Sequence, residues 1–195
     1  KRQEILDYFH ATFTLYESLF ECLADDDAFC ARANPLRHPL IFYYGHTAVF
    51  FINKLNVANL IDQRIDPHIE STLAVGVDEM SWDDLNEQNY DWPTPARVKA
   101  YRDQTRAVVD NFIRECDFSL PIEWNSPMWI ILMGIEHERI HLETTAVLMR
   151  GLPLVRVVIV HTEGTVVVVY NADDVDAACD DRQTKIGHFG RADGP

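Results

Sequence analysis

The stretch LIFYYGHTAVFFINKLNVANL, residues 40–60, decides the fold because it is apolar on nearly every face of a helix. A helix of this kind is covered by neighbours on all sides, so we expect it at the centre of a larger helical structure. His46 lies in its middle, where an imidazole without a partner would be costly. The stretch therefore predicts a buried helix and marks His46 as a side chain that some other group must satisfy.

Three further segments have the 3.6-residue periodicity of helices with one apolar face. They are residues 1–23, 94–116 and 126–151. The last two begin with Thr or Ser followed by Pro, the usual N-cap and first-turn residues, and the last ends at Gly151. The mixed residues 61–93 read as a long connection with room for a short helix. We therefore predict an all-α, four-helix bundle with a long crossover connection between its second and third helices.

The sequence changes character after the last of these helices. VRVVIVHTEGTVVVVY, residues 155–170, is almost entirely β-branched, and its Glu163-Gly164 pair is typical of a hairpin turn. We expect residues 1–154 to form the helical domain, and residues 155–195 to form a short β-rich segment, either a hairpin-like tail or the start of a second domain. The chain begins with lysine and ends in a polar, glycine-bearing run, so it reads as part of a longer polypeptide.

The net charge of −14, from 31 acidic and 17 basic residues, excludes several classes of partner. Such a chain repels the phosphates of nucleic acids and anionic membrane surfaces, and no cluster of Lys and Arg offers a local exception. The longest apolar runs are far shorter than the ~20 residues that span a bilayer, and no signal peptide opens the chain. We therefore expect a soluble protein that binds neither nucleic acid nor membrane.

The cysteines are widely spaced and form no C-x-x-C pair. They are Cys22, Cys30, Cys116 and Cys179. This spacing argues against a zinc ribbon and against a thioredoxin-like redox pair. Together with the missing secretion signal, it favours free thiols in a reducing compartment, and we predict a cytoplasmic protein.

Residues 136–143 read EHERIHLE and fit two metal-binding patterns at once. H-E-x-x-H is typical of zinc peptidases, whereas H-x-x-x-H-x-E implies a different metal and different chemistry. On a helix His137 and His141 are about 40° apart around the axis, so both can bind one metal ion. The extended peptidase motif is absent, because Thr144 and Val147 occupy the positions where it needs Gly and His. A peptidase with a distant Glu as its third ligand stays open as an alternative.

His46 is the better third ligand. Metal sites in bundles are built from inward side chains on facing helices, and a helix with two histidines on one face would satisfy His46. The alternative is a core histidine that is hydrogen-bonded to a neighbour. Three neutral imidazoles leave three positions of an octahedron open, enough for substrates and dioxygen on Fe(II), while with zinc the same set would hold water for hydrolysis. The ligands alone do not decide between these metals.

Two carboxylates of the motif are not predicted as ligands. Glu143 lies two residues past His141, so on a helix it points away from the metal. We expect it either to form hydrogen bonds around the metal site as an outer partner or to be a surface carboxylate. Glu138 is expected to be solvent-facing charge. The other histidines are expected to be solvated side chains in polar or loop-like surroundings: His10, His38, His68, His161 and His188.

Three segments give the chain a specific resemblance to a known family. They are HPLIFYYGHTAVFFINKL (38–55), VGVDEMSWDDLNE (75–87) and GIEHERIHLET (134–144). These segments look like the DinB-like amino-terminal domain of the 5-histidylcysteine sulfoxide synthases of the ovothiol pathway, and the match runs over residues 1–155. The related ergothioneine-pathway sulfoxide synthases share the H-x-x-x-H-x-E element more loosely. The resemblance implies a DinB-like bundle.

The resemblance also implies a function. The family consists of non-haem iron(II) enzymes that use dioxygen to join cysteine sulfur to the imidazole ring of histidine and to oxidise the sulfur to a sulfoxide. Its three iron-binding histidines fall on His46, His137 and His141, the same triad that the spacing indicates. In the family a sulfatase-modifying-factor-like domain follows and supplies much of the substrate pocket, but residues 156–195 do not resemble its start.

Two other functions stay open for the bundle. One is a stand-alone DinB-like thiol transferase or hydrolase that uses another divalent metal. The other is a structural bundle whose metal only staples its helices together. The sequence does not indicate which residues bind a substrate.

Overall fold

The computed structural model describes residues 1–74, 90–153, 156–157, 160–162 and 165–167. This part of the chain contains six helices and two short strands. They are α1 (Arg2–Phe20), α2 (Asp26–Cys30), α3 (Leu40–Val57), α4 (Pro67–Thr72), α5 (Pro95–Glu115), α6 (Pro127–Met149), β1 (Val160–Thr162) and β2 (Thr165–Val167). The four long helices lie where the sequence predicts helices. None of the helices in these residues combines the length and the apolarity that a membrane span needs.

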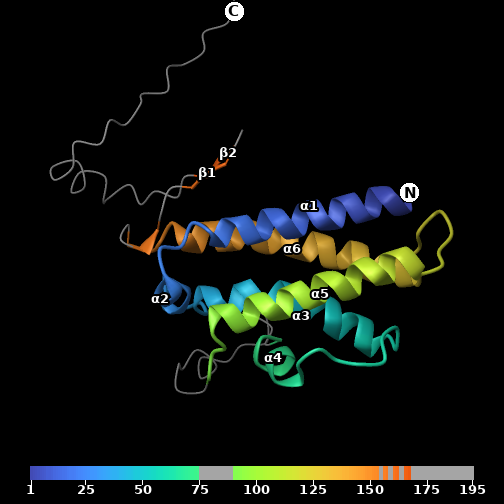
Figure 1. Cartoon of the computed structure of the whole chain (residues 1–195), viewed down its shortest axis with the longest axis horizontal. Coiled ribbons are helices and arrows are strands. Elements are labelled where there is room, and N and C mark those ends of the chain that lie inside the picture. Colours follow the sequence, from blue (N-terminus) through green and yellow to red (C-terminus); the bar gives the residue numbers. More distant parts are fainter. Residues whose placement is uncertain (75–89, 154–155, 158–159, 163–164, 168–195) are drawn as a thin grey trace, which may run out of the picture.

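The four long helices pack side by side (Figure 1). Helix α3 packs against α5 and α6, and α1 packs against the same two helices, so the order around the bundle is α1, α6, α3, α5. Helices α3 and α5 run in the same direction, opposite to α1 and α6 (Figure 1). The chain between α3 and α5 must therefore return along the bundle, as the predicted crossover connection requires. Helix α4 lies in this connection and packs against α3.

The helix ends differ from the predicted ones for local reasons. Helix α1 stops before the predicted Leu23. The turn-prone segment after it contains the short helix α2, because the Asp25 carboxylate caps it by accepting a hydrogen bond from the Ala28 N–H at 2.8 Å. Helix α3 ends before the predicted Leu60. There Asn59 takes a φ of 55°, in the left-handed region where helices commonly end.

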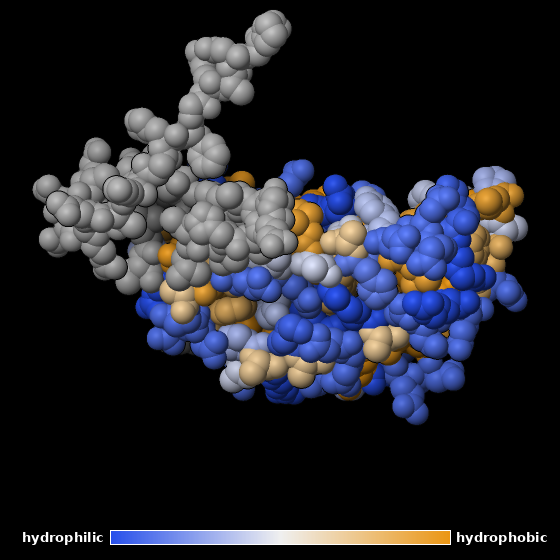
Figure 2. All heavy atoms as spheres, turned by 45° about the horizontal axis from the view of Figure 1, so that its top comes forward, coloured by the Kyte–Doolittle hydropathy of each residue, from blue (hydrophilic) through white to orange (hydrophobic). Residues whose placement is uncertain are grey.

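Apolar side chains from all four long helices fill the centre of the bundle. Gly134 on α6 lies against the ring of Phe51 on α3, and a Cβ added at this glycine would come within 2.2 Å of a ring carbon. The glycine therefore lets α3 and α6 approach each other closely. On the face drawn in Figure 2, hydrophilic residues predominate over the described surface, with smaller apolar areas between them.

The end of the chain is described at only a few residues. Strands β1 and β2 pair antiparallel, with Val160 opposite Val167 and Thr162 opposite Thr165. The turn predicted at Glu163-Gly164 and most of the tail lie outside the described residues, and so does the segment VGVDEMSWDDLNE. The division into a helical domain up to residue 154 and a separate tail stays a prediction.

Candidate metal centre

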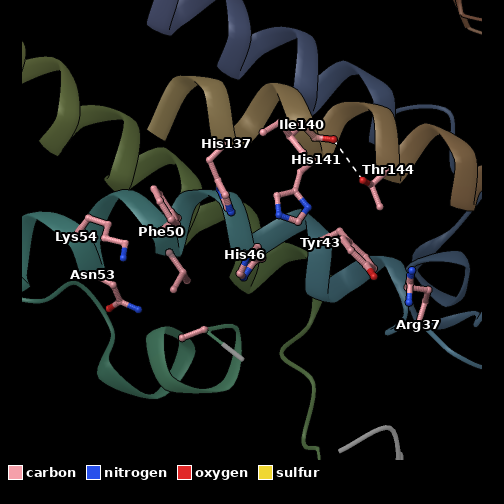
Figure 3. A pocket seen from close by; sticks show the side chains of 12 residues that line it. Arg37, Tyr43, His46, Phe50, Asn53, Lys54, His137, Ile140, His141 and Thr144 are labelled. Carbon is pink, nitrogen blue, oxygen red and sulfur yellow. Dashed lines mark hydrogen bonds between the residues drawn. The ribbon is translucent and has the colours of Figure 1, made fainter. Parts of the chain in front are cut away.

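Three histidines from two facing helices converge on one point of the bundle (Figure 3). His46 comes from the middle of α3, and His137 and His141 come from α6. Each offers a ring nitrogen, and the three nitrogens all lie within 4.8 Å of one another. Among the described residues no other group of three or more His, Cys, Asp or Glu side chains is arranged so that it could hold a metal ion. The structure thus brings together the three residues that the sequence proposes as ligands.

His46 is held in one orientation by its surroundings. Its Nδ1 lies 2.7 Å from the carbonyl oxygen of Leu73, so Nδ1 carries the proton and donates a hydrogen bond to that oxygen. Its ring stacks on Phe42, with 4.8 Å between the ring centres. The lone pair is therefore on Nε2. A carbonyl partner on one ring nitrogen is the usual device that orients a metal-binding histidine, and it leaves the other nitrogen for the metal.

All three imidazoles are neutral in this environment. Burial lowers the pKa of His137 to about 3, and the nearby His141, His46 and Lys54 add to this effect. Burial, together with His46, lowers the pKa of His141 to about 4, and burial also lowers the pKa of His46. The Nδ1 atoms of His137 and His141 are buried and have no hydrogen-bond partner among the described residues. Because neutral imidazole is the form that binds a metal, this donor set fits a divalent metal ion.

A pocket of about 560 Å³ opens beside the triad and is lined by all three histidines. This volume lies within the usual range for small-molecule sites. The ring of Phe50 stacks on His137 with 3.9 Å between centres, and the ring of Tyr43 lies 6.0 Å from that of His141. A small molecule could therefore reach a metal held by the triad. Sequence reasoning identified none of the pocket residues beyond the histidines.

Glu138 is buried, so the prediction that it is solvent-facing charge is wrong. The side chain is 0% exposed, and its Oε1 accepts hydrogen bonds from Arg102 of α5 at 2.8 Å and from Thr47 of α3 at 3.2 Å. Arg102 is equally buried and also donates to Glu17 of α1 at 3.1 Å. Glu138 lies about 100° around the helix axis from His137, so it faces the bundle interior instead of the pocket. This polar network links all four long helices.

The surroundings shift the pKa values of both members of this buried pair. Burial raises the pKa of the Glu138 carboxyl, and the Arg102 guanidinium opposes this effect. Burial alone would lower the pKa of Arg102, but Glu138 and Glu17 outweigh it and raise the pKa. The guanidinium also lies 4.1 Å from the centre of the Phe13 ring, a favourable cation–π contact.

Glu143 lies on the exposed side of α6. It makes no hydrogen bond or ion pair with the described residues, the three histidines included. The role of outer partner therefore has no contact to support it in this part of the chain and stays a prediction.

The other histidines whose side chains the structure describes do not join the triad. His10 pairs with Asp110 at 2.7 Å, and His68 is exposed. His38 is only 2% exposed, so the prediction that it is solvated is wrong. It packs against aromatic rings, among them that of Trp92 at 5.4 Å between centres. The side chains of His161 and His188 lie outside the described residues.

Residues 8–145, which are more than half of the chain, match the DinB superfamily. The chain belongs to this superfamily. The mostly helical structure is consistent with the all-α DinB fold. Members of the DinB superfamily are often metal-dependent enzymes, and the histidine triad gives this member a candidate metal site. A search of curated proteins finds no match to the chain.

Proposed function

We propose that this DinB-superfamily protein is a non-haem iron(II), oxygen-dependent sulfoxide synthase, or the iron-binding domain of one, that joins cysteine sulfur to the imidazole ring of histidine. The observation that carries the proposal is the triad of neutral imidazoles from two facing helices, which lies beside an open pocket. Many chemistries are compatible with such a site. The resemblance of residues 38–55 and 134–144 to the ovothiol-pathway synthases favours this one.

The proposed reaction needs an oxidant. Joining sulfur to a ring carbon removes one hydrogen from the thiol and one from the ring, and adding oxygen to the sulfur removes two more electrons. One dioxygen molecule accepts all four electrons: one of its oxygen atoms becomes the sulfoxide oxygen, and the other leaves as water. Iron(II) held by the triad would supply the redox chemistry that lets dioxygen and the thiol react.

The residues of the chain would bind and orient the reactants. The hydrogen bond from His46 to Leu73 would fix one ligand and the α6 helix the other two, so that a metal held by the triad would be accessible from the pocket. The rings of Phe50 and Tyr43 lie beside the triad and line the pocket, so they would contact a bound reactant. Three neutral ligands add no negative charge of their own, so a substrate thiolate would be attracted to the metal.

The proposal also includes a further domain that completes the substrate pocket and a location in the cell. In the family that the sequence resembles, a sulfatase-modifying-factor-like domain completes the substrate pocket, and we propose the same here. We also propose the cytoplasm as the location, because a reducing compartment keeps thiol substrates reduced.

A divalent-metal thiol transferase or hydrolase is the second candidate, because the same triad and pocket would suit zinc. The zinc peptidase is disfavoured by a specific observation. The glutamate of H-E-x-x-H has to act as a base beside the metal, but Glu138 is fully buried and paired with Arg102. If the metal only linked the helices of a structural bundle, no pocket beside the three histidines would be needed, so the pocket disfavours this alternative.

Anaerobic purification followed by metal analysis and oxygen-uptake measurements tests the proposal. We expect bound iron and an oxygen uptake that requires both cysteine and histidine, with the coupled sulfoxide detected by mass spectrometry. A His137→Ala variant should show neither. Thiol-dependent turnover that needs no oxygen, supported by bound zinc, would replace the proposal with the second candidate.

A further inference from the structure

The pocket beside the triad carries positive charge at both ends. Lys54, in the last turn of α3, and Arg37, just before α3 begins, lie on opposite sides of His46 (Figure 3). At about 1.5 Å per residue, His46 lies about 12 Å along the helix from Lys54 and about 9 Å from Leu40 at the other end. The candidate metal position therefore lies between two cations.

Neither cation has an acidic partner among the described residues. The Lys54 ammonium lies 5.3 Å from the centre of the Phe50 ring, and Arg37 donates a hydrogen bond to the carbonyl oxygen of its neighbour Leu36 at 3.1 Å. Most other basic side chains in the described part of the chain pair with carboxylates. These are Lys1, Arg64, Arg97, Lys99, Arg102, Arg106, Arg114 and Arg156. In a chain with a net charge of −14, two cations without such partners at one pocket are an exception.

The charges act on the pocket itself, whose described lining contains no Asp or Glu. Burial raises the pKa of Tyr43, and Arg37 opposes that rise. The Tyr43 hydroxyl lies on the side of its ring that faces Arg37 (Figure 3). With Arg37 and Lys54 as its charged residues, the described lining of the pocket favours anionic ligands.

We propose that Arg37 and Lys54 each bind a carboxylate, so that the pocket takes two carboxylate groups, one on each side of the histidine triad. The inference rests on the proposed function, since cysteine and histidine each carry one carboxylate close to the group that would reach the metal. A single thiol with two carboxylates, such as glutathione, offers the same chemistry within one molecule. Arg37 can bind a carboxylate through two parallel N–H donors, whereas Lys54 acts as a point charge.

Calorimetric titration of the zinc-loaded full chain tests this inference without turnover. The probes are cysteine against cysteamine and histidine against histamine, because each amine keeps the thiol or imidazole and lacks only the carboxylate. We expect each amino acid to bind roughly 5- to 30-fold more tightly than its amine, the range for a charged hydrogen bond at a partly exposed site. Equal affinities of acid and amine for both pairs would overturn the inference.

Variants that remove one charge show which end of the pocket binds the carboxylate of which ligand. Lys54→Met and Arg37→Gln should each abolish the preference for acid over amine for one of the two ligands. Lys99→Met and Arg150→Gln remove charges elsewhere on the surface and should leave both preferences intact. A preference that survives in both pocket variants would overturn the inference.

Glutathione separates this inference from the proposed function. Binding of glutathione, but of neither amino acid, that weakens in both pocket variants would support the two carboxylate contacts and refute the sulfoxide synthase. Binding of both amino acids without any effect of the pocket variants would refute the contacts and leave the sulfoxide synthase standing. A chain that binds no metal and none of the probes would refute both.

Discussion

Replacing Glu138 by Gln tests the buried polar network that links the four long helices around the candidate metal centre. The substitution keeps the size of the side chain and removes the charge that faces Arg102, at 2.8 Å, in a site with 0% exposure. Removing one partner of a buried ion pair costs about 3–5 kcal/mol, because the other charge is left buried and unpaired. Here Arg102 keeps Glu17 as a second partner at 3.1 Å, so we expect a somewhat smaller loss than this range, about 2–4 kcal/mol.

Urea unfolding followed by circular dichroism measures this loss in the free energy of unfolding, and thermal unfolding provides a second measurement. At this chain length, about 2–4 kcal/mol should lower the melting temperature by roughly 5–15 °C. The matched control is Glu143→Gln, the same change at an exposed position of α6, which should alter the free energy of unfolding by less than about 0.5 kcal/mol. A Glu138→Gln protein as stable as this control would refute the buried pair and would restore Glu138 as a candidate base of a zinc peptidase.

Three further predictions follow from single features of the structure. Glu143→Gln distinguishes the two roles expected for this side chain: if it is a surface carboxylate, as its exposed position on α6 favours, metal affinity should stay unchanged within about 2-fold. An outer partner of the ligands would instead lose roughly 10–100-fold in a metal titration. Gly134→Ala should destabilise the protein by about 1–3 kcal/mol in urea unfolding, because the added methyl group overlaps the Phe51 ring, and unchanged stability would contradict the close approach of the helices. The pKa values of about 3 for His137 and about 4 for His141 lie below the usual 6.5, so the unfolded chain binds more protons in acid. The metal-free protein should therefore lose stability as the pH falls from about 6.5 toward 4, and melting curves should show a smaller loss when both histidines are replaced by Gln.

The long helices and the convergence of the histidines could be predicted because both follow from local spacing. Residues 40–60 are apolar on nearly every face, which favours burial whatever surrounds them, and residues 40–52 are buried apart from the half-buried Phe50. His137 and His141 are one helical turn apart, which places them on one face. His46 is an ionisable group inside the buried helix, which demands a partner. These arguments need no knowledge of how the helices are rotated against each other.

The burial of Glu138 could not be inferred from the motif because it depends on that rotation. Its main partner, Arg102, lies on another helix and is 36 residues away in the sequence. A signal was nevertheless present in α5. Arg102 falls on the same helical stripe as the buried Val98, Thr105 and Val109, and a charge on a buried stripe requires an opposite charge nearby.

His38 was misjudged for a similar reason. Its neighbours in the sequence are polar or proline residues, which are typical of a loop. Its burial comes from rings that follow later in the chain, such as that of Trp92, so only the tertiary packing reveals it.

The most direct test of the metal centre is the metal content of the His46→Ala variant. Wild-type protein, purified without oxygen and analysed by inductively coupled plasma mass spectrometry, should contain a single iron ion per chain. His46→Ala should lose the iron as fully as His137→Ala, although these two ligands are far apart in the sequence, whereas replacing the exposed His68 of helix α4 by Ala should keep it. Stoichiometric iron in the His46→Ala protein would contradict the three-histidine centre.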